Sequence, residues 1–413
     1  MNLLVQSTIL SQKSVIAISG SKSETNRLLL LQALYPNLTL ENASNSDDSE
    51  VMAIALNSKL TIHNSQLIDV HHAGTAMRFL TAYFAIQEGR QVVLTGSSRM
   101  KERPIKILVD ALRQLGATIK YEENEGFPPI RIKGKKLIAN KVSLLSNVSS
   151  QYISALLLIA PKLENGLVLT LEGEITSIPY INMTLGLLNG IGVATSFEKN
   201  VIIIQPKSTI VNQQATIESD WSSASYFYSI IALSPIGSQI TLSRFKENSL
   251  QGDSVLVAMY KNFGVDTVFE TNSISILKSK IQNPKSLIYN LQSSPDIAQT
   301  IAVTCFGLGI GCHLTGLHTL KIKETDRLVA LQNELEKLGA TVSITNDSFT
   351  LESSNLIHSN VKIKTYQDHR MAMAFAPLAL KTPLIIEDAE VVTKSYPNFW
   401  NDLKSIGFVI EEQ

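Results

Sequence analysis

The chain has 413 residues, of which 44% are hydrophobic, enough for two domains or one large domain with internal symmetry. Its 36 Lys and Arg residues balance 36 Asp and Glu residues, so the formal net charge is zero. Proteins that bind nucleic acids or membrane surfaces in a general way usually carry a basic excess, so both classes are disfavoured. No apolar stretch is long enough for a membrane span, and residues 1–10 lack the charged start of a signal peptide. We therefore expect a cytoplasmic protein.

The two cysteines, Cys305 and Cys312, lie in or beside an apolar, glycine-rich run. We interpret them as buried structural thiols in a reducing compartment. No group of cysteines and histidines has the spacing of a zinc site, so the sequence predicts no metal site.

The first informative segment covers residues 20–27 and reads Gly-Ser-Lys-Ser-Glu-Thr-Asn-Arg, with an apolar run directly after it. This order predicts a loop that leads into a helix N-terminus, where free backbone N–H groups and the helix dipole favour an anion. Lys22 and Arg27 would add full positive charges. The spacing of a P-loop is missing. The segment thus predicts either a phosphate or carboxylate site or an ordinary capped surface helix.

Later segments repeat this combination of a small residue or turn, a cation and the expected start of a helix. In one of them we place Pro104 at the first helical position. In another we expect Lys323 and Arg327, four residues apart, to share one helix face. Taken singly, each segment could also be a solvated turn, a salt-bridged helix face or a plain helix cap. The segments are 72–78, 99–104, 149–151, 321–327, 368–373 and the turn at Lys394.

A longer pattern also recurs: an amphipathic helix ends in a hydrophobic residue and a glycine, and a β-rich run follows. The glycines suit the left-handed position that ends many helices. They recur at intervals of roughly 70 residues, and residues 49–63 look like a degenerate sixth copy without its glycine. Six such units predict layered α/β or α+β domains. The glycines are Gly116, Gly192, Gly264, Gly339 and Gly407.

Nine segments together resemble the 5-enolpyruvylshikimate-3-phosphate synthase family of enolpyruvyl transferases, also called 3-phosphoshikimate 1-carboxyvinyltransferases. They follow the order found in that family and span nearly the whole chain. They are Gly-Ser-Lys-Ser-x-x-Asn-Arg (20–27), Ala-Gly-Thr-Ala-Met-Arg (73–78), Arg-Met-Lys-Glu-Arg-Pro (99–104), Val-Ser-Ser-Gln (148–151), Ser-x-Pro-Tyr (177–180), Ser-Ser-Ala-Ser-Tyr-Phe (222–227), Pro-Asp-x-Ala (295–298), Lys-Glu-Thr-Asp-Arg-Leu (323–328) and Asp-His-Arg-Met-Ala-Met (368–373).

The resemblance implies an α/β (α+β) fold of two similar domains, each built from three βαβαββ units in the manner of an inside-out α/β barrel. The six units agree with the repeat count. The resemblance also implies an active site in the cleft between the domains, which substrates should close. We expect an inserted N-terminal domain, 20–218, and a discontinuous C-terminal domain, 1–19 plus 219–413.

The implied function is a transferase of the shikimate pathway, in chorismate and aromatic amino acid biosynthesis, and a target of glyphosate. The family moves the enolpyruvyl group of phosphoenolpyruvate to the 5-hydroxyl of shikimate-3-phosphate and releases phosphate, by addition and elimination through a tetrahedral intermediate. Each substrate carries a carboxylate and a phosphate. Because the family uses no metal, Lys and Arg must compensate these charges. We expect a monomer with no cofactor and no nucleic-acid or membrane partner.

Site residues follow from the matching motif positions. The resemblance implies Asp296, Glu324 and Lys22 as proton-transfer groups. It implies that phosphoenolpyruvate is held by Lys22, Gly74, Arg99, Gln151, Arg327, Arg370 and Lys394. It implies that shikimate-3-phosphate is held by Lys22, Ser23, Arg27, Ser149, Ser150, Gln151, Ser177, Asp296 and Lys323, with Tyr180 beside it.

Two positions depart from the common pattern of the family. His72 stands where Asn is usual, so we expect substrate affinity to vary more with pH near neutrality. Thr319 stands where a substrate-contacting Asn is common, so one contact to substrate is in doubt. Gly74 leaves the room that an alanine would fill, so we expect sensitivity to glyphosate.

Two alternatives remain open. The sister enzyme that transfers enolpyruvate to UDP-N-acetylglucosamine shares the fold but depends on a reactive loop cysteine, whereas these cysteines flank an apolar run. A non-catalytic repeat protein that binds anions is the other alternative. It would have no use for Asp296 and Glu324 among the cations.

Overall fold

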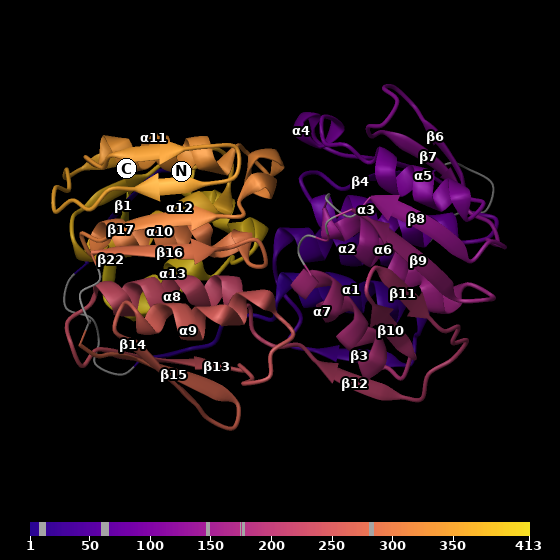
Figure 1. The fold of residues 1–413 in the computed structure, drawn as a ribbon, viewed down its shortest axis with the longest axis horizontal. Coiled ribbons are helices and arrows are strands. Elements are labelled where there is room, and N and C mark those ends of the chain that lie inside the picture. Colours follow the sequence, from indigo (N-terminus) through magenta and orange to yellow (C-terminus); the bar gives the residue numbers. More distant parts are fainter. Residues whose placement is uncertain (8–13, 59–65, 146–148, 174, 176–177, 281–284) are drawn as a thin grey trace. The chain divides into compact units, whose positions relative to one another are not determined.

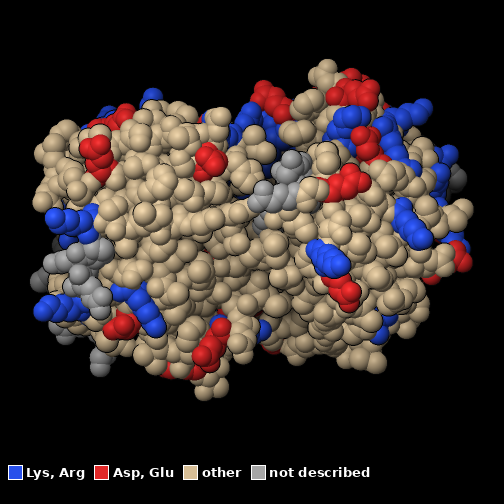
Figure 2. Space-filling view, in the orientation of Figure 1, with Lys and Arg blue, Asp and Glu red and all other residues tan. Residues whose placement is uncertain are grey.

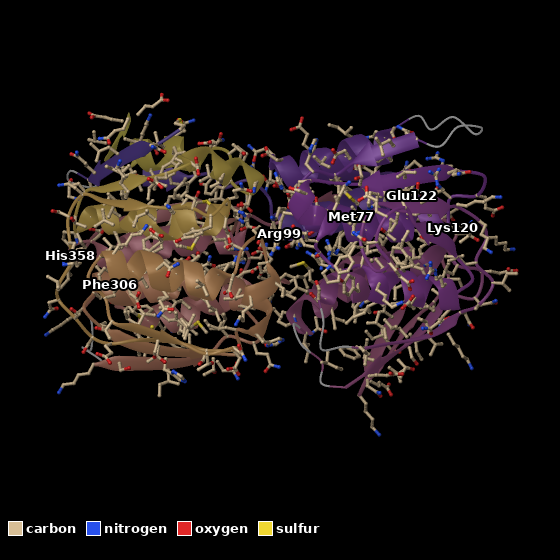
Figure 3. All side chains as sticks on the ribbon, turned by 90° about the horizontal axis from the view of Figure 1, so that it is seen from above. Met77, Arg99, Lys120, Glu122, Phe306 and His358 are labelled. Carbon is tan, nitrogen blue, oxygen red and sulfur yellow. The ribbon has the colours of Figure 1, made fainter. Side chains whose placement is uncertain are left out.

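The computed structural model describes residues 1–413 except 8–13, 59–65, 146–148, 174, 176–177 and 281–284. The chain is a mixed α/β protein and divides into two compact units (Figure 1). One unit is Gly20–Ile217, and the other combines Met1–Ser19 with Glu218–Gln413. Each unit has its own hydrophobic core, in which Met77 and Phe306 are buried, whereas Lys120 and Glu122 lie at the surface (Figure 3).

The unit Gly20–Ile217 has two four-stranded sheets and one two-stranded sheet among its described residues. The first four-stranded sheet has the order β4 (Gln66–Asp69), β5 (Gln91–Thr95), β7 (Ile130–Lys133), β6 (Thr118–Tyr121). The second has the order β10 (Thr195–Glu198), β11 (Val201–Ile204), β9 (Leu167–Glu172), β8 (Lys141–Leu145). The parallel pair consists of β3 (Leu38–Glu41) and β12 (Gln213–Thr216).

Three helices of this unit, α1, α3 and α6, pack against one another and are mostly buried. Nearly every side chain of α3 and α6 is apolar or small, so these helices are covered on all sides. The helices are α1 (Lys22–Leu34), α2 (Asp47–Asn57), α3 (Gly74–Ala85), α4 (Ser98–Lys101), α5 (Lys106–Gln114), α6 (Ser150–Ile159), η1 (Ala160–Lys162) and α7 (Ile178–Gly190).

The other unit has three four-stranded sheets among its described residues. One has the order β20 (Val361–Ile363), β21 (Leu384–Ile386), β1 (Leu3–Ser7), β22 (Phe408–Glu412), so strands from both chain ends pair within it. The second has the order β14 (Val265–Phe269), β15 (Ser273–Lys278), β13 (Gln239–Ser243), β2 (Ser14–Ile16). The third has the order β16 (Ser286–Asn290), β17 (Gly311–Thr315), β19 (Phe349–Leu351), β18 (Val342–Ile344).

Helices α8, α10 and α12 of this unit also pack together in the core. The longer helices are α8 (Trp221–Leu233), α9 (Leu256–Lys261), α10 (Ala298–Gly307), α11 (Arg327–Lys337), α12 (His369–Phe375) and α13 (Phe399–Ser405). The 3₁₀ turns are η2 (Gly252–Val255), η3 (Pro295–Ile297), η4 (His318–Ile322), η5 (Ala376–Leu380) and η6 (Ala389–Lys394).

The predicted repeat is visible in the strand pairing. All five four-stranded sheets contain one parallel pair, and two further strands extend each of them in antiparallel fashion. The parallel pair β3 and β12 forms a sixth sheet among the described residues. Helix α2 begins the predicted degenerate copy at 49–63, whose last residues lie outside the described residues.

The five repeat glycines end their helices as predicted, because each has a positive φ, between 69° and 108°. After α5 the backbone N–H groups of Gly116 and Ala117 donate to the Arg113 and Leu112 carbonyls, which is the Schellman pattern. This pattern satisfies carbonyls that would otherwise lack partners and turns the chain into β6.

Two local expectations were wrong. Pro104 does not begin α5, which starts at Lys106 after Ile105 as the cap residue. Lys323 and Arg327 do not share a helix face, because Lys323 follows η4 and Asp326 caps α11, whose first residue is Arg327. The Asp326 carboxylate accepts from the N–H groups of Leu328 and Val329, which fixes the start of the helix there.

Within the described residues, none of the helices combines the length and apolar character that a membrane crossing requires. On the face shown in Figure 2, Lys and Arg lie among Asp and Glu, with wide uncharged areas between them. The charge balance of the sequence therefore extends to this surface.

Candidate active site

Lys22 is the first residue of α1 and is held by an ion pair. Ser21 caps the helix, since its hydroxyl accepts from the Glu24 N–H at 3.5 Å. The Lys22 ammonium lies 3.2 Å from the carboxylate of Asp48, in the first turn of α2. Only glycine fits two positions earlier, because a Cβ on Gly20 would lie 1.8 Å from a backbone oxygen. The predicted loop and helix are thus present, and the cation has a carboxylate partner.

Arg27, one turn further along α1, is 3% exposed and has no ion pair among the described residues. Its guanidinium donates to the hydroxyls of Thr184 and Ser154 at 2.8 and 3.0 Å and to the Ser23 carbonyl at 2.7 Å. It also lies 6.0 Å from the Tyr180 ring. Burial lowers the pKa of Arg27 to about 10. The hydrogen bonds of Arg27 go to neutral groups, and the nearby charge of Glu24 offsets part of its attraction for an anion.

The starts of α3 and α6 are joined through Gln151, whose side-chain amide donates to the Thr75 hydroxyl at 3.0 Å. Gly74 is the first residue of α3, and no side chain caps that helix. Ser149 caps α6, whose first residue is Ser150. Ser177, also predicted to bind substrate, lies outside the described residues.

The short helix α4 carries Arg99, which pairs with Glu102 at 3.0 Å on an exposed surface. Ser97 caps α4, and its hydroxyl lies 3.0 Å from Nδ1 of His72. The residue that departs from the family pattern therefore connects the segment before α3 to the start of α4.

The position that a Cβ on Gly74 would take lies against the end of the Arg103 side chain. A Cβ at this position would lie 2.7 Å from the nearest nitrogen of the Arg103 guanidinium. An alanine would therefore have to displace the end of that side chain, which is flexible, before it could fill any space.

The second cluster of site residues lies in the other unit and is centred on Arg327, which is 2% exposed. Its guanidinium contacts three carboxylates, with Nε 2.6 Å from Asp368, Nη1 3.0 Å from Asp296 and Nη2 2.7 Å from Glu324. Burial alone would lower the pKa of Arg327, but Asp368 and the other two carboxylates raise it above its ordinary value. The arginine therefore stays charged at any working pH.

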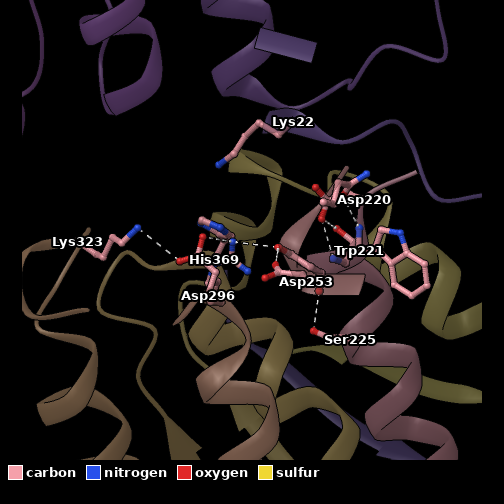
Figure 4. A network of polar contacts seen from close by, with 12 residues as sticks. Lys22, Asp220, Trp221, Ser225, Asp253, Asp296, Lys323 and His369 are labelled. Carbon is pink, nitrogen blue, oxygen red and sulfur yellow. Dashed lines mark hydrogen bonds and ion pairs between the residues drawn. The ribbon is translucent and has the colours of Figure 1, made fainter. Parts of the chain in front are cut away.

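Asp296, in η3, lies where several cations converge (Figure 4). Besides Arg327, its carboxylate contacts Lys323 at 3.5 Å and Arg370 at 3.1 Å. Three cations around one carboxylate favour its ionised form. Lys323 and Arg370 come from separate segments, after η4 and in α12, so tertiary packing brings these groups together.

Asp253 extends this network and was not predicted. Its carboxylate accepts a short hydrogen bond from the Ser222 hydroxyl, and Arg370 also reaches that hydroxyl, at 3.4 Å. Burial, followed by the negative charge of Asp296, raises the pKa of Asp253 to about 6. A lone aspartate in a Gly-Asp-Ser turn gave no signal in the sequence that could have identified it.

The remaining predicted residue, Lys394, lies at the end of η6 and donates to the Gln367 carbonyl at 2.7 Å. No ion pair joins it to the Asp296 network among the described residues. The described part of the chain also contains no group of three or more His, Cys, Asp or Glu residues that could hold a metal ion.

The network in the second unit thus gathers Asp296, Glu324 and Arg327 around one point. A family model described as EPSP synthase (3-phosphoshikimate 1-carboxyvinyltransferase) matches residues 7–403. The chain belongs to the EPSP synthase family. The sequence resemblance is therefore confirmed over nearly the whole length.

Curated relatives in the EPSP synthase family agree with this assignment. A 3-phosphoshikimate 1-carboxyvinyltransferase of Bacteroides fragilis (strain YCH46) is 46% identical over 403 residues, which are 97% of this chain and 96% of that protein. One from Haemophilus influenzae (strain PittGG) is 34% identical and covers 98% of this chain and 99% of that protein.

Solved EPSP synthase structures confirm the predicted α/β fold. One, from Acinetobacter baumannii, superposes with a TM-score of 0.80, covers 100% of both chains and is 21% identical in sequence. At 21% sequence identity, this similarity supports the fold alone and not the function.

The motifs of the EPSP synthase family predicted the cations and two of their carboxylate partners, Asp296 and Glu324, but missed three other carboxylates. Asp48 and Asp368 each hold a predicted cation, and Asp253 lies within the network. Asp368 lies inside a matching motif, directly before His369, and its position as cap residue of α12 could have marked it. Asp48 and Asp253 lie outside the nine segments.

Proposed function

We propose that this chain is a 3-phosphoshikimate 1-carboxyvinyltransferase that moves the enolpyruvyl group of phosphoenolpyruvate to the 5-hydroxyl of shikimate-3-phosphate and releases phosphate. The observation that carries the proposal is the network of Arg327, Asp296 and Glu324, which lie in motifs of the EPSP synthase family. We further propose that the enzyme works as a monomer in the cytoplasm.

The cations compensate the negative charges of the two substrates. Two phosphates and two carboxylates must be held together, and their mutual repulsion is severe without positive charge nearby. Arg side chains suit bidentate binding of phosphate and carboxylate, and Lys acts as a point charge. In this proposal Lys22, Gly74, Arg99, Gln151, Arg327, Arg370 and Lys394 hold phosphoenolpyruvate, and Lys22, Ser23, Arg27, Ser149, Ser150, Gln151, Ser177, Asp296 and Lys323 hold shikimate-3-phosphate, with Tyr180 beside it.

Asp296 takes the proton of the attacking 5-hydroxyl. Its three cationic neighbours favour the ionised carboxylate, so it is ready to accept a proton at neutral pH. The hydroxyl oxygen then attacks C2 of phosphoenolpyruvate while C3 gains a proton, which gives the tetrahedral intermediate.

Glu324 and Lys22 are the candidates for proton transfer at C3. The Glu324 side chain is 24% exposed and touches Arg327, so it is neither free in solvent nor fully buried. Elimination removes a proton from C3 and expels phosphate. The arginines that hold phosphoenolpyruvate in this proposal stabilise the negative charge that develops on the departing phosphate.

The alternative acceptor, a UDP sugar, has less support. Both cysteines are buried, with 0% and 1% exposure for Cys305 and Cys312. Burial raises the pKa of the Cys305 thiol, which further reduces its reactivity. The sister enzyme needs a reactive loop cysteine, and neither thiol suits that task.

The test is phosphate release from phosphoenolpyruvate by the full chain, with shikimate-3-phosphate or UDP-N-acetylglucosamine as the acceptor. We expect release only with shikimate-3-phosphate, competitive inhibition by glyphosate against phosphoenolpyruvate, and loss of turnover in Asp296→Asn. Release with the UDP sugar instead would overturn the proposal. Anion binding without release under either condition would favour the non-catalytic alternative.

A further inference from the structure

Helix α11 carries a carboxylate on its buried face. Glu334 lies about two helical turns after Arg327, and the two residues are 0% and 2% exposed. Between them on the same face lie Ala330 and Leu331, which are apolar and buried. A carboxylate in such a place costs free energy unless hydrogen bonds replace the lost water. Glu334 also lies outside the nine family segments, so the motifs give it no task.

The Glu334 carboxylate accepts hydrogen bonds from two directions. Oε2 accepts from the ammonium of Lys337, in the same helix, at 2.6 Å and from the backbone N–H of Lys364 at 3.0 Å. Oε1 accepts from the Tyr366 hydroxyl at 2.7 Å. Burial, followed by the hydrogen bond to Glu334, raises the pKa of Tyr366 to about 12, so this hydroxyl keeps its proton at neutral pH. Two of these donors thus belong to the segment that follows β20.

That segment ends in a turn whose two central residues have a left-handed backbone. Tyr366 has a φ of 53° and Gln367 a φ of 56°, and the Asp368 N–H donates to the Thr365 carbonyl at 2.8 Å. Positive φ at both central positions is typical of a type I′ turn, which favours glycine and asparagine because other side chains strain the backbone there. Tyrosine and glutamine in this turn therefore need contacts from outside to hold its shape.

This turn sets the positions of three cations of the proposed site. The Gln367 carbonyl accepts from the ammonium of Lys394 at 2.7 Å. The Asp368 carboxylate accepts from Nε of Arg327 at 2.6 Å and, as the cap of α12, from the backbone N–H of Arg370 at 2.9 Å. These are the cations that this unit contributes to phosphoenolpyruvate in the proposed function. A different shape of the turn would therefore disturb all three contacts.

We propose that Glu334 is a positioning residue that, through the Tyr366 hydroxyl, holds this strained turn in the shape that phosphoenolpyruvate binding requires. This role rests on the proposed function and adds to it a residue that does not touch substrate. Helix α11 then holds the segment at two points, through Arg327 at Asp368 and through Glu334 at Tyr366. Without the second point the turn relaxes part of the time, and the apparent affinity falls with the fraction that keeps the competent shape.

The first test measures steady-state kinetics at saturating shikimate-3-phosphate. Replacing Glu334 itself would leave buried donors without a partner and endanger folding, so Tyr366→Phe carries the test. We expect KM for phosphoenolpyruvate to rise by about 3- to 10-fold, since one hydrogen bond to a charged group is lost. The kcat should stay nearly constant, because saturating phosphoenolpyruvate restores the competent shape. KM for shikimate-3-phosphate should change by less than about twofold, because none of its proposed binding residues lies in the turn.

Lys337→Ala is the matched control. It removes another donor to the same carboxylate and a 3.3 Å contact to the Lys362 carbonyl in β20, but it leaves the turn intact. Its KM for phosphoenolpyruvate should stay within about twofold of the wild type, even if its melting temperature falls as far as that of Tyr366→Phe. Equal rises of KM in both variants would overturn the positioning role, because loss of stability would then explain them.

The second test relieves the strain with Gln367→Gly. The side chain of Gln367 is exposed, and glycine adopts a positive φ without strain. Added to Tyr366→Phe, the glycine should bring KM for phosphoenolpyruvate back to within about twofold of the wild type, because the turn then holds its shape without the hydrogen bond. A double variant whose KM stays as high as that of Tyr366→Phe would overturn the role of strain in this turn.

Hydrogen exchange at the Asp368 N–H distinguishes failure of this role from failure of the proposed function, since it needs no substrate. The bond from this N–H to Thr365 closes the turn, so exchange in Tyr366→Phe should accelerate by at least the factor by which KM rises, and Lys337→Ala should match the wild type. A wild type that releases no phosphate with shikimate-3-phosphate refutes the function. An active wild type with unchanged KM in Tyr366→Phe refutes the role of Glu334 alone, whether or not exchange accelerates.

Discussion

At the scale of single residues, Lys22 combines a structural contact with a proposed chemical task. Its ammonium pairs with Asp48 at 3.2 Å, and both side chains are mostly buried, with 18% and 14% exposure. The pair stabilises the fold modestly, whereas the positive charge at the start of α1 is what an anionic substrate would require.

We expect Lys22→Ala to lower kcat by about 100-fold or more, because a charged donor to the reacting groups is lost. Its free energy of unfolding should fall by only about 1 kcal/mol. Denaturant unfolding and the phosphate-release assay measure the two effects. Asp48→Asn is the matched control, since it breaks the same ion pair but leaves the cation. Equal losses of turnover in both variants would contradict this division of roles.

Asp253 makes stability depend on pH, because burial and Asp296 raise its pKa from 3.8 to about 6. Between about pH 4 and pH 6 the folded protein holds a proton that the unfolded chain has released. The stability from this group is therefore complete below pH 4 and is lost as the pH rises through 6.

Asp253→Asn cannot ionise, so we expect it to exceed the wild type in stability above pH 6 by about 1–3 kcal/mol. Below pH 4 the two proteins should be equal. Melting temperatures from about pH 3 to about pH 8 provide the measurement. Parallel curves for wild type and variant would show that Asp253 does not titrate in this range.

At the scale of helices and strands, the cap residues decide where the site residues lie. Asp326 is the cap residue of α11. Arg327 is therefore the first residue of that helix, whereas Lys323 lies before it, at the end of η4. The two residues still meet at Asp296. Their spacing in the sequence suggested one helix face. The Asp326 side chain instead accepts from the Leu328 and Val329 N–H groups, so the helix begins only after Lys323.

The glycines that end the repeat helices can be tested without disturbing the packing. Gly116 has φ of 104°, and a Cβ there would meet nothing within 4 Å. We expect Gly116→Ala to lower the free energy of unfolding by about 1–2 kcal/mol through backbone strain alone. Gly190→Ala is the control, because its Cβ would also meet nothing and its φ is not positive. That variant should be neutral or more stable by about 0.5–1 kcal/mol. Similar losses in both variants would argue against strain at Gly116.

At the scale of the whole molecule, the predicted binding residues are divided between two units, each with its own core. Lys22, Gly74 and Gln151 belong to one unit, whereas Arg327 and Arg370 belong to the other. If both sets of residues hold the same pair of substrates, two ligands bound together should stabilise the protein by more than the sum of their separate effects.

We therefore expect the melting temperature to rise further with shikimate-3-phosphate and glyphosate together than the sum of the two separate rises. A ligand at 100 times its dissociation constant stabilises by about 2.7 kcal/mol, so an excess from coupled binding is measurable. Scanning fluorimetry with each ligand and with both provides the data, and Arg27→Ala serves as a variant in which shikimate-3-phosphate should lose its effect. Strictly additive shifts would mean that the two ligands bind independently.

The sequence by itself determined the family and the α/β repeat, and it predicted the cations of the proposed site. Glycines such as Gly116 and cap residues such as Ser21 act on their own neighbours, so their effect can be predicted from adjacent residues. Functional motifs such as 20–27 are also local, and their order along the chain identified the family.

Only the tertiary structure decided which charges meet. The three unpredicted aspartates hold or border cations that lie far away along the chain. The separation is 26 residues between Lys22 and Asp48 and 117 residues between Asp253 and Arg370, and Asp368 lies between these limits. No local pattern therefore marks the pairs. The guanidinium of Arg103 reaches Gly74 in the same way, across 29 residues of sequence. Contacts of this kind depend on how distant segments pack, because electrostatic attraction acts through space and not along the chain.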